Sequence, residues 1–420
     1  MYIKRHMQEW SIGKTILAPQ MIFIAGPRQA GKTTLIEQFL TSIKCGSLIF
    51  NWDTPDVKKK YRSDPLFFES EARLLKGKSK QVWIGLDEIH KRIQWKNILK
   101  GYYDQFKNDF RFIVSGSARL DIFRKTGDAL IGRYFLFNLF PFSLSEIGSR
   151  PLKELSLWQA LIGGKNFSSI FDLIAGTQPL PYDLWEQLYE FGPFPDPLIK
   201  SDYSFSNLWH RDYISLYLRE ELRDMTRIAD IDGVETLVSL LPDRVGSIMS
   251  INSLKHDLQV SHGTVATWLE SLSRLYLIFS IAPWQKKIHK SIKKEKKYYF
   301  MDWAYVPKKA TGQRFENMVA VYLLRLIHAL NENGLGDYKL HFVRDLSKRE
   351  VDFIITDGSK PLVLIEAKTQ AMRIPGFALN LAKKIGNIPV LVLTHQSGNL
   401  KKIGPQAYII SAHHFFSCIP

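Results

Sequence analysis

Cysteine is scarce in this chain of 420 residues, because only Cys45 and Cys418 are present. The two residues lie far apart in the sequence and have none of the short spacings that bind zinc. A disulfide framework and a zinc site are therefore both unsupported, and we expect a reducing compartment.

Long apolar runs are also lacking. No stretch of the sequence approaches the about 18 consecutive apolar residues that a membrane-spanning helix needs, so we expect no membrane partner. Residues 1–20 contain Lys4, Arg5 and Glu9 before any apolar core and do not resemble a signal peptide. These absences predict a cytoplasmic location.

Acidic residues are outnumbered by basic ones. The chain has 57 Lys and Arg against 41 Asp and Glu, which gives a formal net charge of +16. The hydrophobic fraction of 45% is that of a globular protein, and the length predicts two to four domains. A basic surplus of this size suits an anionic partner, and DNA is the nucleic acid that we expect. Solubility alone is the open alternative.

A phosphate-binding pattern occupies residues 26–33, between an apolar run of buried-strand type at Met21–Ala25 and an amphipathic stretch that begins at Thr34. A loop of this kind surrounds phosphates with backbone N–H groups at the start of a helix, so it predicts a bound nucleoside triphosphate. Lys32 would reach the β- and γ-phosphates, and the Thr33 hydroxyl would hold Mg²⁺. The pattern G-x-x-x-x-G-K-[ST] is matched by Gly26, Pro27, Arg28, Gln29, Ala30, Gly31, Lys32 and Thr33, and Thr34 is included in the predicted site.

Two adjacent carboxylates follow the next strongly apolar strand, at Asp87 and Glu88. In ATPases that use an activated water, an aspartate at this point holds the Mg²⁺ shell and the following glutamate polarises the attacking water. We assign these roles to Asp87 and Glu88. A strand that merely ends in two solvated acids is the alternative.

Two further positions complete the predicted ATP site. The strand at residues 110–115 ends in small hydroxyls, and Ser115 or Ser117 is expected to bond the γ-phosphate or the water. Arg133, before a fifth apolar run, is expected to contact the nucleotide in its own subunit or across the interface of a homo-oligomer. For the serines the alternative is a plain turn after a strand, and for Arg133 it is an arginine that only lies on the surface. The five alternating strands and helices of residues 1–150 predict a parallel sheet with both faces covered.

The middle of the chain holds weaker signals. Gly and Pro punctuate residues 151–204, which predicts a helical lid or linker. In residues 205–305, two short helices joined by a tight turn and followed by a strand predict a winged-helix module. A lysine run between Gln285 and Lys297 is a candidate phosphate contact, with a solvated hairpin tip as the alternative. The candidate recognition residues are Ser261, His262, Thr264 and Thr267, and a protein-packing role is equally open.

Residues 306–420 are predicted to have the order αβββαβ, with a hairpin across Asp357 and Gly358. Asp352 and Glu366 then lie on neighbouring strands and can share Mg²⁺. Lys368 shares the face of Glu366 because strand side chains alternate, and Glu316 on the preceding helix could complete the site. This is the geometry for a metal-activated water that attacks a phosphodiester. An ordinary exposed pair of strands, or a nuclease fold kept only for binding, is the alternative.

This constellation resembles the PD-(D/E)xK nuclease superfamily, although Val351 stands where the name-giving proline would be. With the phosphate loop, Asp87-Glu88, Ser115-Gly116-Ser117 and Gly132-Arg133-Tyr134, the whole chain is similar to prokaryotic AAA-type ATP-binding proteins that carry a nuclease-like C-terminal domain of unknown function. The resemblance implies ATP binding and hydrolysis with a suspected DNA-related role. The expected fold is α/β: a P-loop NTPase with an AAA/ASCE-type parallel sheet, then a helical lid, a winged-helix module and a restriction-endonuclease-like domain.

Two functions follow from these expectations. In the first, ATP hydrolysis moves the lid and winged-helix module of a DNA-acting protein relative to its nuclease-like domain. In the second, the chain is an ATP-dependent switch or scaffold whose C-terminal domain binds DNA or a partner protein and cuts nothing.

Overall fold

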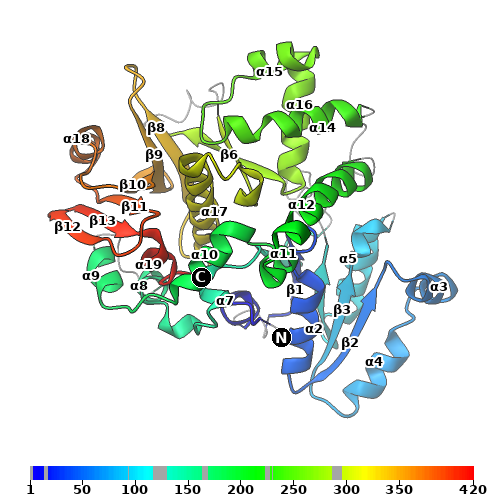
Figure 1. Cartoon of the computed structure of the whole chain (residues 1–420). Helices are drawn as coiled ribbons and strands as arrows, with labels where there is room; N and C mark the ends of the chain where they lie inside the picture. The colour runs from blue at the N-terminus through cyan, green and yellow to red at the C-terminus, as the bar shows by residue number, and fades with distance from the viewer. Residues whose placement is uncertain are drawn as a thin grey trace. The chain divides into compact units, whose positions relative to one another are not determined.

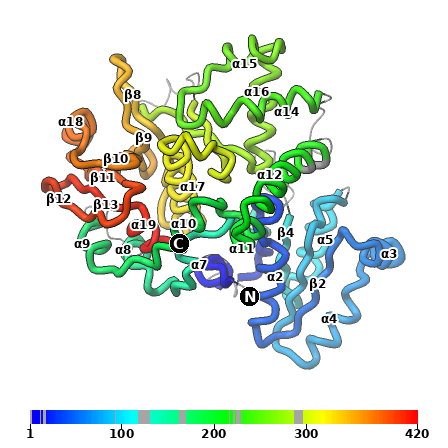
Figure 2. The backbone as a smooth tube through the Cα atoms, viewed as in Figure 1, coloured from blue at the N-terminus to red at the C-terminus, as the bar shows by residue number. Residues whose placement is uncertain are grey.

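A computed structural model describes residues 3–13, 18–92, 94–116, 130–162, 169–222, 228, 230–285 and 296–420 (Figures 1 and 2). Two compact units divide the chain, one of residues 5–141 and the other mainly of residues 142–420. Ser117 lies outside the described residues, as does most of the lysine run, namely Lys286, Lys287, Lys290, Lys293 and Lys294. The predicted limits at residues 150, 204 and 305 stay predictions.

The first unit is organised by a five-stranded sheet in which every strand pair is parallel. Because the strands are parallel, their carboxyl ends all lie at one edge of the sheet. The five-stranded parallel sheet expected from the sequence is confirmed. The strand order is β2 (Gly46–Asn51), β3 (Val82–Asp87), β4 (Phe110–Ser115), β1 (Met21–Ala25) and β5 (Tyr134–Asn138).

Helices cover both faces of this sheet, as Figure 1 shows. On one face, α2 (Lys32–Ser42) packs so closely that a side chain at Gly85 would touch Ile36 and Leu40. On the other face, α4 (Glu69–Lys76) and α5 (Trp95–Phe106) share a hydrophobic core with the alternate residues of β3, including Leu86. The shorter elements are η1 (Gln8–Ile12), α3 (Pro55–Ser63), which follows β2, and η2 (Ile89–Lys91), which follows β3.

The second unit is organised by a mixed eight-stranded sheet. The hairpin predicted across Asp357 and Gly358 is confirmed, because it joins antiparallel β9 and β10. The expected wing strand β6 pairs in parallel with β8, so it belongs to the same sheet as β9 and β10. The strand order is β12 (Leu400–Gly404), β13 (Ala407–Ser411), β11 (Val390–Thr394), β10 (Lys360–Lys368), β9 (Glu350–Asp357), β8 (Tyr338–Arg344), β6 (Ile278–Pro283) and β7 (Lys297–Phe300).

Two helices lie along this sheet. The long helix α17 (Thr311–Glu332) packs against β8 and β10, and α18 (Gly376–Lys384) packs against β9 and β11. The edge strand β12 and the last elements, β13 and α19 (Ala412–Phe416), lie beyond the last strand that we predicted from the sequence. The first helix of the nuclease-like pattern and the strands that carry its carboxylates are therefore neighbours in space.

The regular elements of residues 142–275 are all helices in the described parts of this range. The two short helices predicted around residue 260 are confirmed. Each is capped by a serine, because Ser250 accepts a hydrogen bond from the Ser253 amide and Ser261 accepts one from the Thr264 amide. No helix of the described residues is long and apolar enough to span a membrane. The elements of this region are α7 (Leu144–Ile147), η4 (Leu152–Glu154), α8 (Ser156–Ile162), α9 (Ile170–Ala175), α10 (Tyr182–Phe191), α11 (Pro195–Lys200), α12 (Tyr203–Tyr217), η6 (Leu218–Leu222), α14 (Ile231–Leu240), η7 (Pro242–Arg244), α15 (Ile251–Leu258) and α16 (His262–Arg274), and η9 (Trp303–Tyr305) follows β7.

Candidate nucleotide-binding site

The phosphate loop connects β1 to α2 and depends on its two glycines. Gly26 and Gly31 have φ angles of 149° and 91°, in the region that side chains rarely adopt. At Gly26 there is also no room, because an added Cβ atom would lie 2.3 Å from the carbonyl oxygen of Leu139. The spacing of glycines that suggested the loop is therefore required by the backbone itself.

Lys32, the first residue of α2, is almost fully buried against this loop. Its ammonium donates hydrogen bonds to the carbonyl oxygens of Gly26 at 3.1 Å and of Pro27 at 2.7 Å. The charge thus lies over the loop in which phosphates are expected, where a phosphate oxygen can replace a carbonyl as its partner.

Thr33, Asp87 and Ser115 meet at the carboxyl edge of the sheet. The Thr33 hydroxyl donates to Oδ2 of Asp87 at 2.7 Å, and the Ser115 hydroxyl donates to Oδ1 of the same carboxylate. The strands explain this convergence, because Asp87 and Ser115 are register partners on β3 and β4. Because strand side chains alternate, Asp87 lies on the same face of β3 as Gly85, and α2 covers that face. The structure therefore brings three residues predicted from separate motifs into direct contact.

Glu88 stands directly after β3 in an uncommon backbone conformation, with a φ angle of 57°. Its amide donates to the carbonyl oxygen of Ser115 at 3.0 Å, and its carboxylate lies 3.5 Å from the ammonium of Lys91. Burial raises the pKa of Glu88 above its ordinary value; Lys32 and Lys91 oppose this shift, and the charge of Asp87 adds to it. A carboxylate with a raised pKa is a stronger proton acceptor than an exposed one.

Arg133 does not reach this edge of the sheet. Its backbone carbonyl accepts a hydrogen bond from Met21, the first residue of β1, so Arg133 lies at the amino ends of the strands. Its guanidinium donates to Asp104 of α5 at 2.8 Å. A contact between Arg133 and a nucleotide in its own subunit is therefore not supported, and a role across an interface stays a prediction.

Arg5 is a buried residue that we did not connect with the site from the sequence. Its guanidinium donates to the carbonyl oxygen of Ala30, at 3.1 Å, and to that of Phe140. Arg5 thus ties the middle of the phosphate loop to the segment that follows β5. Nothing in the local sequence distinguishes Arg5 from the other basic residues near it, because its partners are carbonyl groups far along the chain.

A second constellation lies in the other unit, as predicted, on β9 and β10. The Lys368 ammonium lies 2.8 Å from the Glu366 carboxylate and 3.2 Å from that of Asp352. Asp352 also accepts a hydrogen bond from the Ala367 amide at 2.9 Å. Burial, and then the charge of Asp352, raise the pKa of Glu366 to about 7. Asp352, Glu366 and Lys368 are therefore in mutual contact.

Glu316 joins this region from α17 through two residues that the sequence did not single out. It accepts a hydrogen bond from the Tyr299 hydroxyl at 2.8 Å, and the ammonium of Lys297 lies 3.3 Å away. Lys297, almost fully buried on β7, also pairs with Glu350. Burial raises the pKa of Glu316 to about 7, and the nearby Asp352 contributes in the same direction. The lysine is therefore held between acids from two different elements.

The two sites differ in their fitness for a metal ion. In the first unit, a hydroxyl and a carboxylate oxygen that lie 2.7 Å apart form the hard-oxygen set that suits Mg²⁺. In the second unit, the ammonium of Lys368 already bridges Asp352 and Glu366. Across the described ranges, no group of three His, Cys, Asp or Glu side chains converges to hold a metal ion. A metal ion bound by Asp352 and Glu366 therefore stays a prediction from the sequence.

Comparison with known families identifies two regions. Residues 18–148 match an AAA domain, and residues 182–311 match a domain of unknown function, DUF8612. The first part of the chain is an AAA domain. Its match encloses the phosphate loop, Asp87, Glu88 and Ser115, and it begins before β1 and ends after β5.

Curated relatives of this chain are distant and uncharacterized. The proteins Mb2031c of Mycobacterium bovis and Rv2008c of Mycobacterium tuberculosis are each 22% identical over 302 residues, or 72% of this chain. The chain spans 58% of the length of these two relatives. MJ1637 of Methanocaldococcus jannaschii is 24% identical over 329 residues and is covered to 67% of its length.

Solved structures show weak overall likeness. The Walker-type ATPase PABY2304 of Pyrococcus abyssi superposes with a TM-score of 0.42 at 12% identity, over 73% of this chain and 95% of that one. The ADP complex of Hsp104 from S. cerevisiae superposes with a TM-score of 0.31 at 15% identity, over 80% of this chain and 44% of that one.

Proposed function

We propose that this protein binds ATP with Mg²⁺ and hydrolyses it in the AAA domain. The observation that carries the proposal is the contact of Thr33 and Ser115 with the two oxygens of Asp87, directly beside Glu88. These residues come from three separate motifs and meet at the carboxyl edge of a parallel sheet, where ligands of such sheets bind.

Each residue has a distinct task in this reaction. The phosphates lie in the loop of residues 26–33, and the Lys32 ammonium moves from loop carbonyls to phosphate oxygens. Thr33 and Asp87 would hold Mg²⁺, which would supply positive charge against the negative charge of the phosphates. Glu88 accepts the proton of the attacking water, and Ser115 fixes the orientation of Asp87.

The test is ATP binding and phosphate release by Lys32→Ala. We expect this variant to lose both activities, because the loop loses the cation that neutralises the phosphates. Lys44→Ala is the matched control, because Lys44 is exposed just beyond the other end of α2. ATP binding by Lys32→Ala with the affinity of the wild type would contradict the assignment of the loop.

A second candidate function is action on DNA by the nuclease-like constellation. It is supported by the contact of Asp352, Glu366 and Lys368 on two adjacent strands, in the arrangement of the PD-(D/E)xK superfamily. Because Lys368 bridges both carboxylates, we assign no step to a metal ion there. A winged-helix role for α15 and α16 in DNA binding stays a proposal of the same kind, as does a homo-oligomer in the cytoplasm.

Cleavage assays separate the two outcomes of this second candidate. Branched, single-stranded and duplex DNA are incubated with Mg²⁺ or Mn²⁺ and with wild type, Asp352→Ala, or the control Asp337→Ala, which changes an exposed acid before β8. Cleavage lost only in Asp352→Ala supports a nuclease. Identical behaviour of all three proteins leaves the domain as a binding module.

A further inference from the structure

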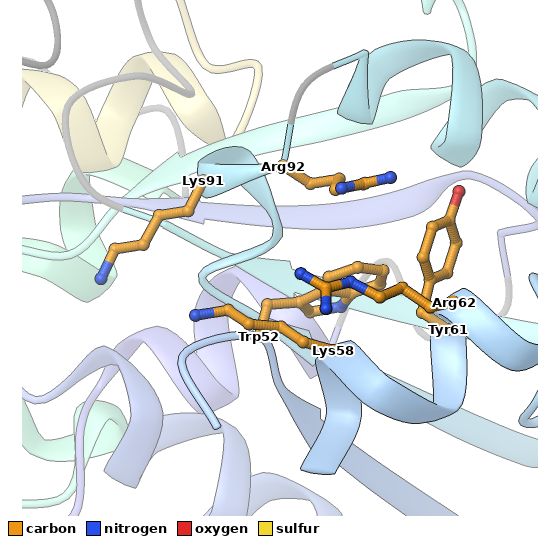
Figure 3. Close-up of a pocket in the computed structure, with 6 residues that line it drawn as sticks. All are labelled: Trp52, Lys58, Tyr61, Arg62, Lys91 and Arg92. Carbon is orange, nitrogen blue, oxygen red and sulfur yellow. The ribbon is translucent and has the colours of Figure 1, made fainter. Parts of the chain in front are cut away.

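The AAA unit contains a pocket of about 310 Å³ whose lining is separate from the phosphate loop (Figure 3). None of its lining residues belongs to residues 26–33. The lining comes from the carboxyl end of β2, from α3 and from the turn after β3. These residues are two aromatic and four basic side chains, namely Trp52, Lys58, Tyr61, Arg62, Lys91 and Arg92.

The basic side chains enter this pocket from two elements. Figure 3 shows Lys58 and Arg62 on α3 and Lys91 and Arg92 at the turn of η2. Within the part of the chain that the structure describes, neither guanidinium forms an ion pair with a carboxylate. The guanidinium of Arg92 instead lies 5.2 Å from the centre of the Tyr61 ring. Two permanently charged groups thus face one cavity without a counter-ion, which favours an anionic ligand.

Aromatic rings form the remaining surface of the pocket. The Trp52 and Tyr61 rings lie 4.9 Å apart between centroids, and Trp52 is almost fully buried. The indole N–H of Trp52 is buried and has no hydrogen-bond partner in the described residues. This N–H is too deeply buried for a ligand to reach, so the Trp52 and Tyr61 rings contribute only apolar surface to the pocket. Phosphate oxygens at the guanidinium groups, with a base next to a flat ring, match this lining.

We propose that this pocket binds single-stranded nucleic acid, with phosphates at Arg62 and Arg92 and a base beside Tyr61. A chain of phosphates is favoured over a single small anion because the positive charge of α3 extends past the pocket. Lys59 and Lys60 follow Lys58 on the exposed surface of the helix, and Lys60 also pairs with Asp56 at 3.4 Å. A strand that leaves the pocket along α3 meets these further cations, whereas a free nucleotide does not.

The pocket is connected to the hydrolytic residue through Lys91. The Lys91 ammonium donates to both carboxylate oxygens of Asp53, at 2.7 and 2.6 Å, and lies 3.5 Å from the Glu88 carboxylate. A phosphate bound beside Lys91 competes with Asp53 and Glu88 for the positive charge of the Lys91 ammonium. Binding of a strand therefore changes ATP turnover, a consequence that rests on the proposed function, whereas the binding itself does not.

Photocrosslinking in the absence of ATP locates the binding site of the strand. The full chain is irradiated with a thymidine oligonucleotide of about 15 nucleotides that carries iodouridine, and the crosslinked peptides are identified by mass spectrometry. We expect crosslinks in peptides that contain residues 52–62 or 91–92. Crosslinks confined to other segments would overturn the proposal, whatever the ATPase activity of the protein.

Affinity measurements with matched variants complete the test. The double variant Arg62→Ala/Arg92→Ala is expected to bind the oligonucleotide about tenfold more weakly, and its salt slope is expected to fall by about 1.4, for two phosphate contacts on a single strand. Lys44→Ala, at an exposed position beyond the end of α2 and outside the lining of the pocket, is expected to stay within about twofold of the wild type. Unfolding curves establish that each variant is folded.

Three results contradict the proposal. Equal oligonucleotide affinity of the double variant and the wild type removes the pocket from the interface. Competition by tripolyphosphate or AMP as strong as that by the oligonucleotide makes it a small-anion site. A raised KM for ATP with unchanged oligonucleotide affinity makes it part of the ATP site. The proposal of ATP hydrolysis is tested separately, by the Lys32→Ala variant. A negative result for strand binding therefore leaves the proposed ATPase function untouched, and the reverse also holds.

Discussion

The Thr33 hydroxyl donates a hydrogen bond to Oδ2 of Asp87 at 2.7 Å, and so joins the first turn of α2 to the end of β3. Thr33→Val keeps the shape of the side chain but removes this hydrogen bond. We expect Mg²⁺-dependent ATP turnover to fall about 10- to 100-fold, the usual effect of losing a hydrogen bond to a charged group. The measurement is phosphate release at saturating ATP. Thr33→Ser keeps the hydroxyl and should retain most activity; equal loss in Thr33→Ser and Thr33→Val would contradict this role.

Ser115 holds the other oxygen of the same carboxylate. In Ser115→Ala, Oδ1 of Asp87 loses its hydroxyl partner, so we expect turnover to fall by about tenfold while the fold is kept. The control is Ser42→Ala, because the Ser42 hydroxyl only donates to the Phe39 carbonyl at the far end of α2. Turnover equal in the two variants would remove Ser115 from the site.

Gly26 is predicted to tolerate no side chain. An alanine there places its Cβ atom 2.3 Å from the carbonyl oxygen of Leu139 and in a disfavoured conformation. We expect Gly26→Ala to lower the free energy of unfolding by about 3 kcal/mol or more and to abolish ATP binding. Gly101, inside α5 with no atom within 4 Å of an added Cβ, supplies the control. Gly101→Ala should raise stability by about 0.5–1 kcal/mol, and a comparable loss in both variants would refute the steric argument.

The stability of the second unit should depend on pH through His210 on α12. Its Nε2 atom lies 2.8 Å from Oδ2 of the buried Asp302. Burial lowers the pKa of His210, but attraction to Asp302 and the hydrogen bond between them outweigh it, so the pKa is raised above its ordinary value; Arg314 opposes this. Because the pKa of His210 is higher in the folded than in the unfolded protein, protonated His210 stabilises the fold. This contribution is fully present below about pH 6.5, the ordinary pKa of histidine, and is lost as the pH rises through the pKa of the folded protein.

His210→Gln removes that contribution. We therefore expect the variant to lose more unfolding free energy, relative to the wild type, at about pH 6 than at about pH 9. Urea unfolding at both pH values measures it. His256→Gln, at an exposed position of α15, is the control and should show no such dependence. A difference between His210→Gln and the wild type that does not vary with pH would show that the interaction is purely steric.

Much of the AAA unit was predictable because its signals are local. Apolar runs mark the buried strands, and the glycine spacing marks the loop, since both are required by backbone geometry. The carboxylates of β9 and β10 were placed on neighbouring strands because the hairpin across Asp357 and Gly358 is a short-range signal.

Other features depend on contacts that no local pattern contains. Arg5 bonds to carbonyl groups 25 and 135 positions away, so its sequence neighbourhood is uninformative. Lys297 looked like the end of a lysine run, yet it is buried because β7 joins the eight-stranded sheet beside Glu316 and Glu350. The pairing of Arg133 with Asp104 likewise follows from the packing of α5 near the start of β5.

The proposed hydrolysis depends on Glu88 as the residue that activates the water. ATP affinity and phosphate release are therefore compared in Glu88→Gln and the wild type. We expect the affinity to stay within about twofold while turnover falls about 100-fold or more, because glutamine keeps the size of the side chain but cannot accept the proton. Wild-type turnover in Glu88→Gln would contradict this role of Glu88.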